Sequence, residues 1–144
     1  MASLYVTDTY TWAMRQADAL RRRSANEVDW ENVAEEIESV GKSEARELRS
    51  RYVVLLTHLL MWLAQAEKRG PSWETTIRLQ RELIDEHLGT NPGLKPLQDE
   101  LLGRAYREAR VRAFEETGLG IETFPETNPF TLAQAMDPDF WPDA

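Results

Sequence analysis

Residues 52–64 read YVVLLTHLLMWLA, and this stretch decides the fold that we expect. It is apolar except for Thr57 and His58, and apolar side chains continue at helical spacing on both sides of it. A helix that is apolar on nearly all sides is buried in a protein core. We therefore predict one helix over residues 43–69 as the central element of the core.

The same stretch is too short to cross a membrane. Thirteen helical residues span about 20 Å, whereas a membrane-spanning helix needs about 20 residues. The N-terminus has neither the basic region nor the apolar run of a signal peptide. The chain has no cysteine, which excludes disulfides, thiolate metal sites and cysteine nucleophiles. We expect a cytoplasmic protein without membrane contact.

The remaining chain is mostly helical in pattern. Gly41 is a natural helix stop, and Gly70 with Pro71 breaks the central helix. The fold that follows is all-α, an antiparallel bundle of about five helices with short connections. Its length of 144 residues predicts a single domain over residues 1–144, with a helical body (1–118) and a tail (119–144). The other expected helices cover residues 8–24, 30–40, 73–88 and 96–117, with a short one at 131–136.

The tail is rich in proline and aromatic residues, which is unusual for a disordered segment. We expect it to pack across the bundle through its aromatic side chains. Thr131 and Gln134 have the spacing of a capping box for the short helix. The arginines of the fifth helix precede the tail and could form ion pairs with its acids. These arginines are Arg104, Arg107 and Arg110, and the acids are Glu122, Glu126, Asp137 and Asp139.

The net charge of −8 is concentrated at the end of the chain. Residues 115–144 carry seven acids and no Lys or Arg, whereas residues 1–114 are nearly neutral. Nucleic-acid binding depends on neutralising phosphates, and this chain has no basic patch for it. We expect no nucleic-acid partner.

One candidate contact site lies in the string SWETTIRLQR, residues 72–81. Its tryptophan and arginines could face the incoming tail and contact an anion, a ligand or a partner. The alternative is that the arginine stems cover the core while their charged ends form ion pairs between helices. The residues of this candidate site are Trp73, Arg78 and Arg81, together with Phe130 and Trp141 from the tail.

A second candidate is a set of carboxylates that could hold Mg²⁺ or Mn²⁺. Glu31, Glu35 and Glu38 share one helix face, and Glu82 with Asp85 could meet them from another helix. The alternative is a solvated acidic face. Neither histidine completes a Glu-x-x-His motif, since Leu55 and Ile84 stand three residues before them. We expect His58 to be a buried structural histidine and His87 to interact with a helix dipole, and we expect no cofactor.

Five strings that recur in order resemble the all-helical bacterial family catalogued as domain of unknown function 29. They are LYVTDTYTW, ENVAEEIESVG, HLLMW, SWETTIRLQR and TFPETNPFTLAQAMDPDFWP, and they span nearly the whole chain. The resemblance implies a helical fold, and it implies no activity, cofactor or catalytic residue.

We therefore expect a non-enzymatic interaction module that binds a protein partner, or itself, near the tail. One alternative is a small metal-dependent hydrolase that uses the carboxylates above. Another is an acidic, antitoxin-like partner of a basic protein.

Overall fold

The computed structural model describes residues 3–143, and all their regular structure is helical, as predicted. The chain divides into two compact units, Met1–Ser43 and Glu44–Ala144, and the expectation of a single domain stays a prediction. The α-helices are α1 (Leu4–Thr7), α2 (Thr9–Arg21), α3 (Trp30–Ala64), α4 (Pro71–Thr90), α5 (Gln98–Thr117) and α6 (Leu132–Met136). The short 3-10 helices are η1 (Ala25–Glu27), η2 (Ala66–Lys68), η3 (Pro92–Leu97) and η4 (Ile121–Thr123).

The N-terminal unit is held by polar contacts around one buried tryptophan. The Trp12 indole packs edge-on against Tyr5, with 4.6 Å between ring centroids, and its Nε1 donates to Asp29 Oδ2 at 3.0 Å. Tyr5 donates its hydroxyl to Glu36. Asp8 caps α2 by accepting from the backbone N–H of Thr11 at 3.0 Å. These contacts tie α1 and α2 to the beginning of α3.

The same contacts shift two pKa values. The hydrogen bond to Glu36 raises the pKa of Tyr5 to about 12. Hydrogen bonds from Asn32 and Trp12 lower the pKa of Asp29. A lowered pKa in the folded state means that Asp29 stabilises the fold above its unfolded pKa, and that this contribution is lost as the pH falls through the folded value.

The prediction of separate helices over residues 30–40 and 43–69 was wrong, because α3 continues through Gly41 to Ala64. A single glycine inside a helix costs only about 1 kcal/mol relative to alanine, and no proline occurs nearby to break the hydrogen bonds. Lys42 also pairs with Glu38 at 2.9 Å, one helical turn earlier, which supports the helix at this point. After Ala64 the chain passes into η2, five residues before the predicted end.

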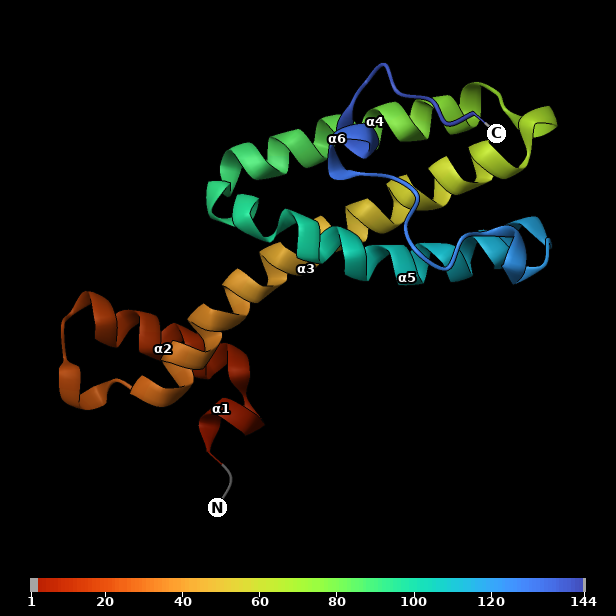
Figure 1. Cartoon of the computed structure of the whole chain (residues 1–144). Coiled ribbons are helices and arrows are strands. Elements are labelled where there is room, and N and C mark those ends of the chain that lie inside the picture. Colours follow the sequence, from red (N-terminus) through yellow and green to blue (C-terminus); the bar gives the residue numbers. More distant parts are fainter. Residues whose placement is uncertain (1–2, 144) are drawn as a thin grey trace. The chain divides into compact units, whose positions relative to one another are not determined.

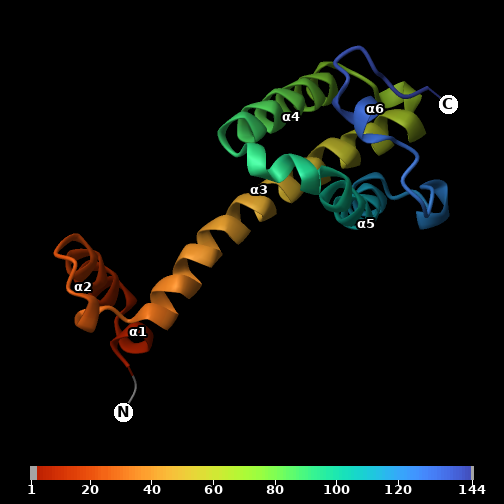
Figure 2. The same cartoon turned by 60° about the vertical axis from the view of Figure 1, so that its left-hand side comes forward.

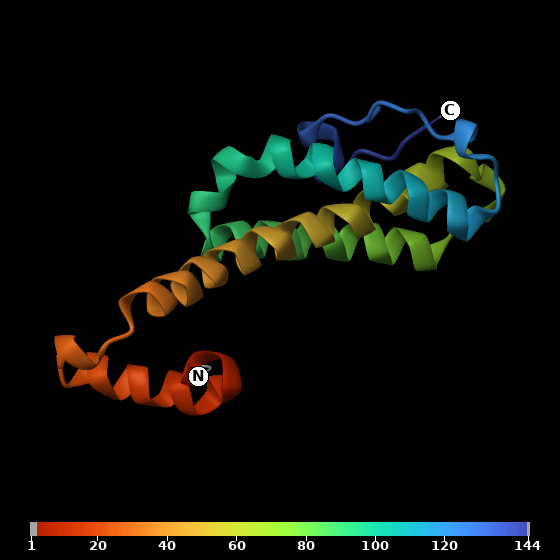
Figure 3. The same cartoon turned by 90° about the horizontal axis from the view of Figure 1, so that it is seen from below.

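The second half of α3 forms the core of the C-terminal unit. Figures 1 and 3 show it between α4 and α5, with successive helices running in opposite directions. The buried side chains of α3 are Leu48, Tyr52, Val53, Leu55, Leu56, Thr57, Leu59, Leu60 and Met61. Those of α5 include Ala105, Ala109 and Ala113. None of the helices described in residues 3–143 is long and apolar enough to cross a membrane.

The tail packs across this helix set, as predicted. Phe124 and Phe130 are buried, and the Trp141 ring lies 4.8 Å from that of Trp62 on α3. The last described residues lie beside the connection between α3 and α4 (Figures 1 and 2), where Asp143 pairs with Arg69 at 3.6 Å. Thr131 and Gln134 form the predicted capping box at the start of α6.

The predicted ion pairs between α5 and the tail are absent from the described residues. Arg110 donates instead to the backbone oxygens of Phe124 (3.0 Å) and Ile121 (3.3 Å). Arg104 pairs with Glu100 within α5 at 2.9 Å. The physical reason is that an irregular segment has carbonyl groups without backbone partners, and these must find other donors. The tail's carboxylates stay exposed to water.

Two tail residues provide a test of this packing. Phe124→Ala should lower the free energy of unfolding by about 3–5 kcal/mol, because Phe124 is buried and its loss leaves a cavity. The matched control Ile121→Ala should change it by less than about 0.5 kcal/mol, since Ile121 is exposed. Urea unfolding followed by circular dichroism measures both. Equal effects of the two substitutions would contradict the packing of the tail.

Candidate functional site

Arg81 is a buried charged residue on α4 that binds the backbone of the tail. Its exposed fraction is 3%. Nε donates to Ala135 O at 2.7 Å, and Nη2 donates to Phe140 O at 2.9 Å and to Gln134 O at 3.5 Å. Burial lowers the pKa of this guanidinium. Arg81 therefore satisfies carbonyl groups at both ends of the segment from α6 to Phe140.

Trp141 closes this site over the arginines. The guanidinium carbons of Arg78 and Arg81 lie 5.1 Å and 5.5 Å from the centre of its ring. At these distances a cation is attracted to the negative face of an aromatic ring. Arg78 is exposed and also pairs with Glu74 at 3.0 Å. The site is thus an aromatic and cationic clamp on the tail.

The structure brings together three of the five residues of the predicted contact site, namely Arg78, Arg81 and Trp141. Trp73 is half-buried against the core. Phe130 is buried and packs edge-on against Phe140, with 6.1 Å between ring centroids. The observed contacts hold the tail in place, and contact of this set with a ligand or partner stays a prediction.

The carboxylates of the predicted Mg²⁺ or Mn²⁺ site fall into two groups. Glu31, Glu35 and Glu38 line a surface pocket of the N-terminal unit together with Lys42, which pairs with Glu38. Glu82 and Asp85 line a pocket of the C-terminal unit together with Arg78 and Arg81. Each group is therefore accompanied by a basic side chain, and the role of the five acids as metal ligands stays a hypothesis.

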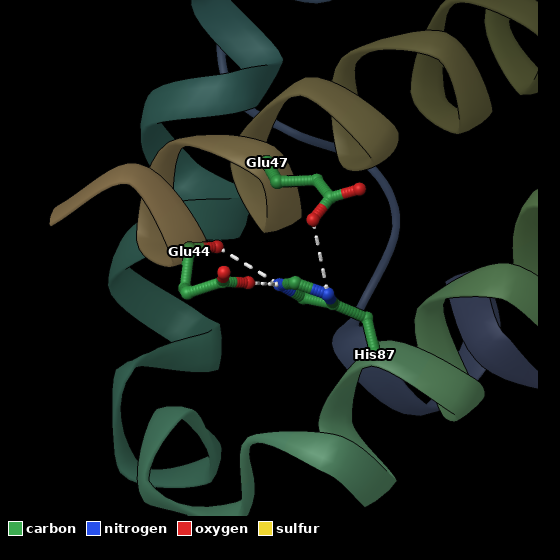
Figure 4. A group of neighbouring side chains, drawn as sticks. All are labelled: Glu44, Glu47 and His87. Atoms are coloured by element: carbon green, nitrogen blue, oxygen red, sulfur yellow. Dashed lines mark hydrogen bonds and ion pairs between the residues drawn. The ribbon is translucent and has the colours of Figure 1, made fainter. Parts of the chain in front are cut away.

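A different group of metal-ligand type is formed by Glu44, Glu47 and His87 (Figure 4). Each residue offers one donor atom, and these atoms lie within 4.8 Å of one another. Among residues 3–143 this is the one group of at least three His, Asp or Glu side chains that meets this distance. Sequence reasoning missed it, although the Glu-x-x-Glu spacing on a predicted helix was a visible signal. The histidine comes from another helix, about forty residues later.

His58, the other histidine, makes a local contact. Its Nδ1 lies 2.8 Å from the backbone oxygen of Val54 in the same helix. The side chain is half-buried and belongs to no group of metal-ligand type in the described residues.

The clamp can be tested with its two arginines. Arg81→Gln should lower the free energy of unfolding by about 3 kcal/mol or more, because each hydrogen bond from a charged group contributes about 1.5–3 kcal/mol and the carbonyls are left without donors. The control Arg78→Gln should cost less than about 1 kcal/mol, since its ion pair is exposed to solvent. Urea unfolding measures both, and chymotrypsin cleavage at the tail aromatics should accelerate in Arg81→Gln alone. Equal stability losses would mean that Arg81 does not hold the tail.

Comparison with known proteins gives one match. The family model "Domain of unknown function DUF29" matches residues 4–141, which is nearly the whole chain. Neither the curated proteins nor the solved structures contain a match. The described fold is all-helical, as the resemblance implied. The chain therefore belongs to the family of Domain of unknown function DUF29.

Proposed function

We propose that this protein is a non-enzymatic interaction module whose N-terminal unit binds a protein partner. The observation that carries the proposal is the exposure of apolar side chains in that unit. Large exposed apolar residues of the described chain are concentrated within residues 3–43, which make up less than a third of it. Those of the N-terminal unit are Val6, Tyr10, Met14, Leu20, Trp30, Ile37 and Val40.

These residues form stripes on two helices. Trp30, Ile37 and Val40 follow helical spacing along the first part of α3, and their exposed fractions are 59%, 67% and 64%. Tyr10 and Met14 lie one turn apart on α2. Exposed apolar patches on soluble proteins mark interaction sites, and tryptophan and tyrosine are enriched at the energetic centres of interfaces. An apolar helix stripe is typical of helix-in-groove recognition.

The N-terminal unit does not use these side chains for its own core. Its buried apolar residues are Trp12, Ala19 and Val28. Polar contacts around Trp12 supply much of the remaining order. By contrast, the aromatic residues of the tail are packed inside the C-terminal unit. This difference supports a partner surface on the N-terminal unit rather than at the tail.

Site-specific crosslinking tests the proposal. A photoreactive amino acid at position 37 should crosslink the full chain to one protein in extract of the source cells, because Ile37 is the most exposed apolar side chain of the α3 stripe. The same probe at position 79 is the matched control, since Leu79 is an exposed apolar residue of α4 in the C-terminal unit. The substitutions Trp30→Ser and Val40→Ser should abolish the crosslink from position 37. Mass spectrometry distinguishes a second copy of the chain from another protein. No product, or equal products from both positions, would contradict the proposal.

The charge of the tail favours a second candidate, an antitoxin-like partner of a basic protein. Among the acids of residues 115–143, only Asp143 forms an ion pair in the described structure. Its partner is Arg69, at 3.6 Å. The remaining acids are exposed, so their charge is available to a cationic surface.

Neutralising Glu122, Glu126, Asp137 and Asp139 should then abolish capture of a basic protein at low salt. As a control, neutralising Glu86 on α4 together with Asp99, Glu100 and Glu108 on α5 should leave the capture of the basic protein unchanged. Loss of capture in both variants would contradict a role for the tail.

A further inference from the structure

Two exposed faces of the N-terminal unit have the same residue spacing. On α2 and on the first turns of α3, one face carries residues at positions i, i+4, i+7 and i+11, and such residues lie in one row along a helix. Most members of both rows are exposed. The α2 row consists of Tyr10, Met14, Ala17 and Arg21, and the α3 row of Trp30, Ala34, Ile37 and Gly41. The two rows thus match each other in length.

The α2 row is turned away from the core of its own unit. Trp12 and Ala19 are the buried residues of α2, and each follows a member of the row by two positions. Two positions in a helix correspond to a rotation of about 200°, so the buried side lies opposite to the row. Tyr10 and Met14 are accordingly 75% and 55% exposed. Because α2 contacts the beginning of α3 through Trp12, which donates to Asp29 at 3.0 Å, the α2 row cannot meet the α3 row of its own chain.

Charged side chains accompany both rows on the same flank. The residues that directly follow the row members lie about 100° further round the helix, beside the row. These flank residues are Thr11, Arg15, Asp18 and Arg22 on α2, and Glu31, Glu35, Glu38 and Lys42 on α3. Arg22 neutralises Asp18 at 2.8 Å, whereas Arg15, Glu31 and Glu35 form no ion pair within residues 3–143. The flank of α2 is therefore basic, and the flank of α3 is acidic.

An antiparallel alignment of the α2 row on the α3 row makes the side chains complementary in size. Because both rows have the same spacing, each residue of one row then has a counterpart in the other. Met14 lies opposite Ile37, and both are apolar and exposed. Tyr10 lies opposite Gly41, where an added Cβ would meet no atom within 4 Å, so there is room for the phenol ring. The bulkiest side chain of the α2 row thus meets the smallest residue of the α3 row.

The same alignment brings opposite charges together. Two helices that pack antiparallel face each other with the same flank, so the basic flank of α2 meets the acidic flank of α3. Arg15 then lies near Glu38, and Arg22 lies near Glu31. Charge pairs beside an apolar seam determine which helices pair and in which direction.

We propose that α2 of one copy of this chain docks antiparallel on the first turns of α3 of a second copy. This inference rests on the proposed interaction module and names its partner. A foreign protein would have to reproduce the spacing, the small residue opposite Tyr10 and the charge of the row that it replaces, whereas a second copy has all three. Each copy carries both rows, so each offers a complement to the other.

Crosslinking between purified full-length chains tests the contact. A photoreactive amino acid at position 37 should crosslink to residues 9–21 of an isotope-labelled chain mixed with it, because Met14 faces Ile37 across the contact. Mass spectrometry distinguishes bonds between chains from bonds within one chain. The same probe at position 79, where the exposed Leu79 lies on α4, is the control and should yield no crosslink between chains. A crosslink that reaches only α3 of the second copy would overturn the pairing.

A reversal of charges provides a second test. Arg15→Glu and Glu38→Arg should each weaken self-association at least about tenfold, because each places like charges on the facing flanks. An equimolar mixture of the two variants should recover the association, since opposite charges then face each other again. Sedimentation equilibrium measures the association, and circular dichroism checks that each variant folds. Arg107→Glu, at an exposed position of α5, makes the same change of charge and should leave the association unchanged.

The outcomes separate the second copy from the proposed function. A monomeric unsubstituted chain that still crosslinks from position 37 to another protein in cell extract would overturn the second copy as partner and leave the interaction module in place. A monomeric chain without any crosslink would overturn both. Equal weakening by Arg107→Glu, or a mixture that stays monomeric, would overturn the antiparallel pairing. If a reversed variant does not fold, the crosslink from position 37 decides the result.

Discussion

The need to cover the second half of α3 on most of its sides governs the C-terminal unit. Its buried residues, from Leu48 to Met61, occupy most of the helix circumference, and Val54, His58 and Trp62 on the remaining side are half-buried. Two neighbouring helices leave part of such a surface open. The tail covers the remainder with Phe124, Phe130 and Trp141, and α6 adds the buried Ala135. A proline-rich segment of irregular structure is therefore an integral part of the core.

A segment of irregular structure that covers a core buries carbonyl groups without backbone donors, and the arginines supply hydrogen-bond donors to them. Carbonyl groups of the tail have no partners in a helix or a sheet, and each buried one without a donor destabilises the fold. Arg81 and Arg110 together donate to carbonyl groups at several points of the tail, and Tyr106 donates to Pro125 O. Because the arginines are engaged with the backbone, the tail's carboxylates stay in water. The packing of the tail and its exposed negative charge thus have one cause.

The two units differ in where their apolar residues lie. In the C-terminal unit the core is large and continuous, whereas in the N-terminal unit a polar network surrounds Trp12 and the stripe from Trp30 to Val40 faces outward. The proposed interaction surface rests on the exposed apolar side chains of the N-terminal unit.

The sequence by itself determined the helical class, the burial of residues 52–64, the capping box at Thr131 and the packing of the tail. These features follow from local spacing and from the free energy of burying apolar groups, which act whatever the neighbours are. The helix boundary predicted at Gly41 was wrong, because a glycine weakens a helix without ending it. Only the tertiary structure decided which groups meet across helices. Arg81 donates to carbonyl groups more than fifty residues later, and His87 meets Glu44 and Glu47 about forty residues before it. Such pairings depend on how packed helices are rotated and aligned against one another. Hydrophobic periodicity specifies neither of these.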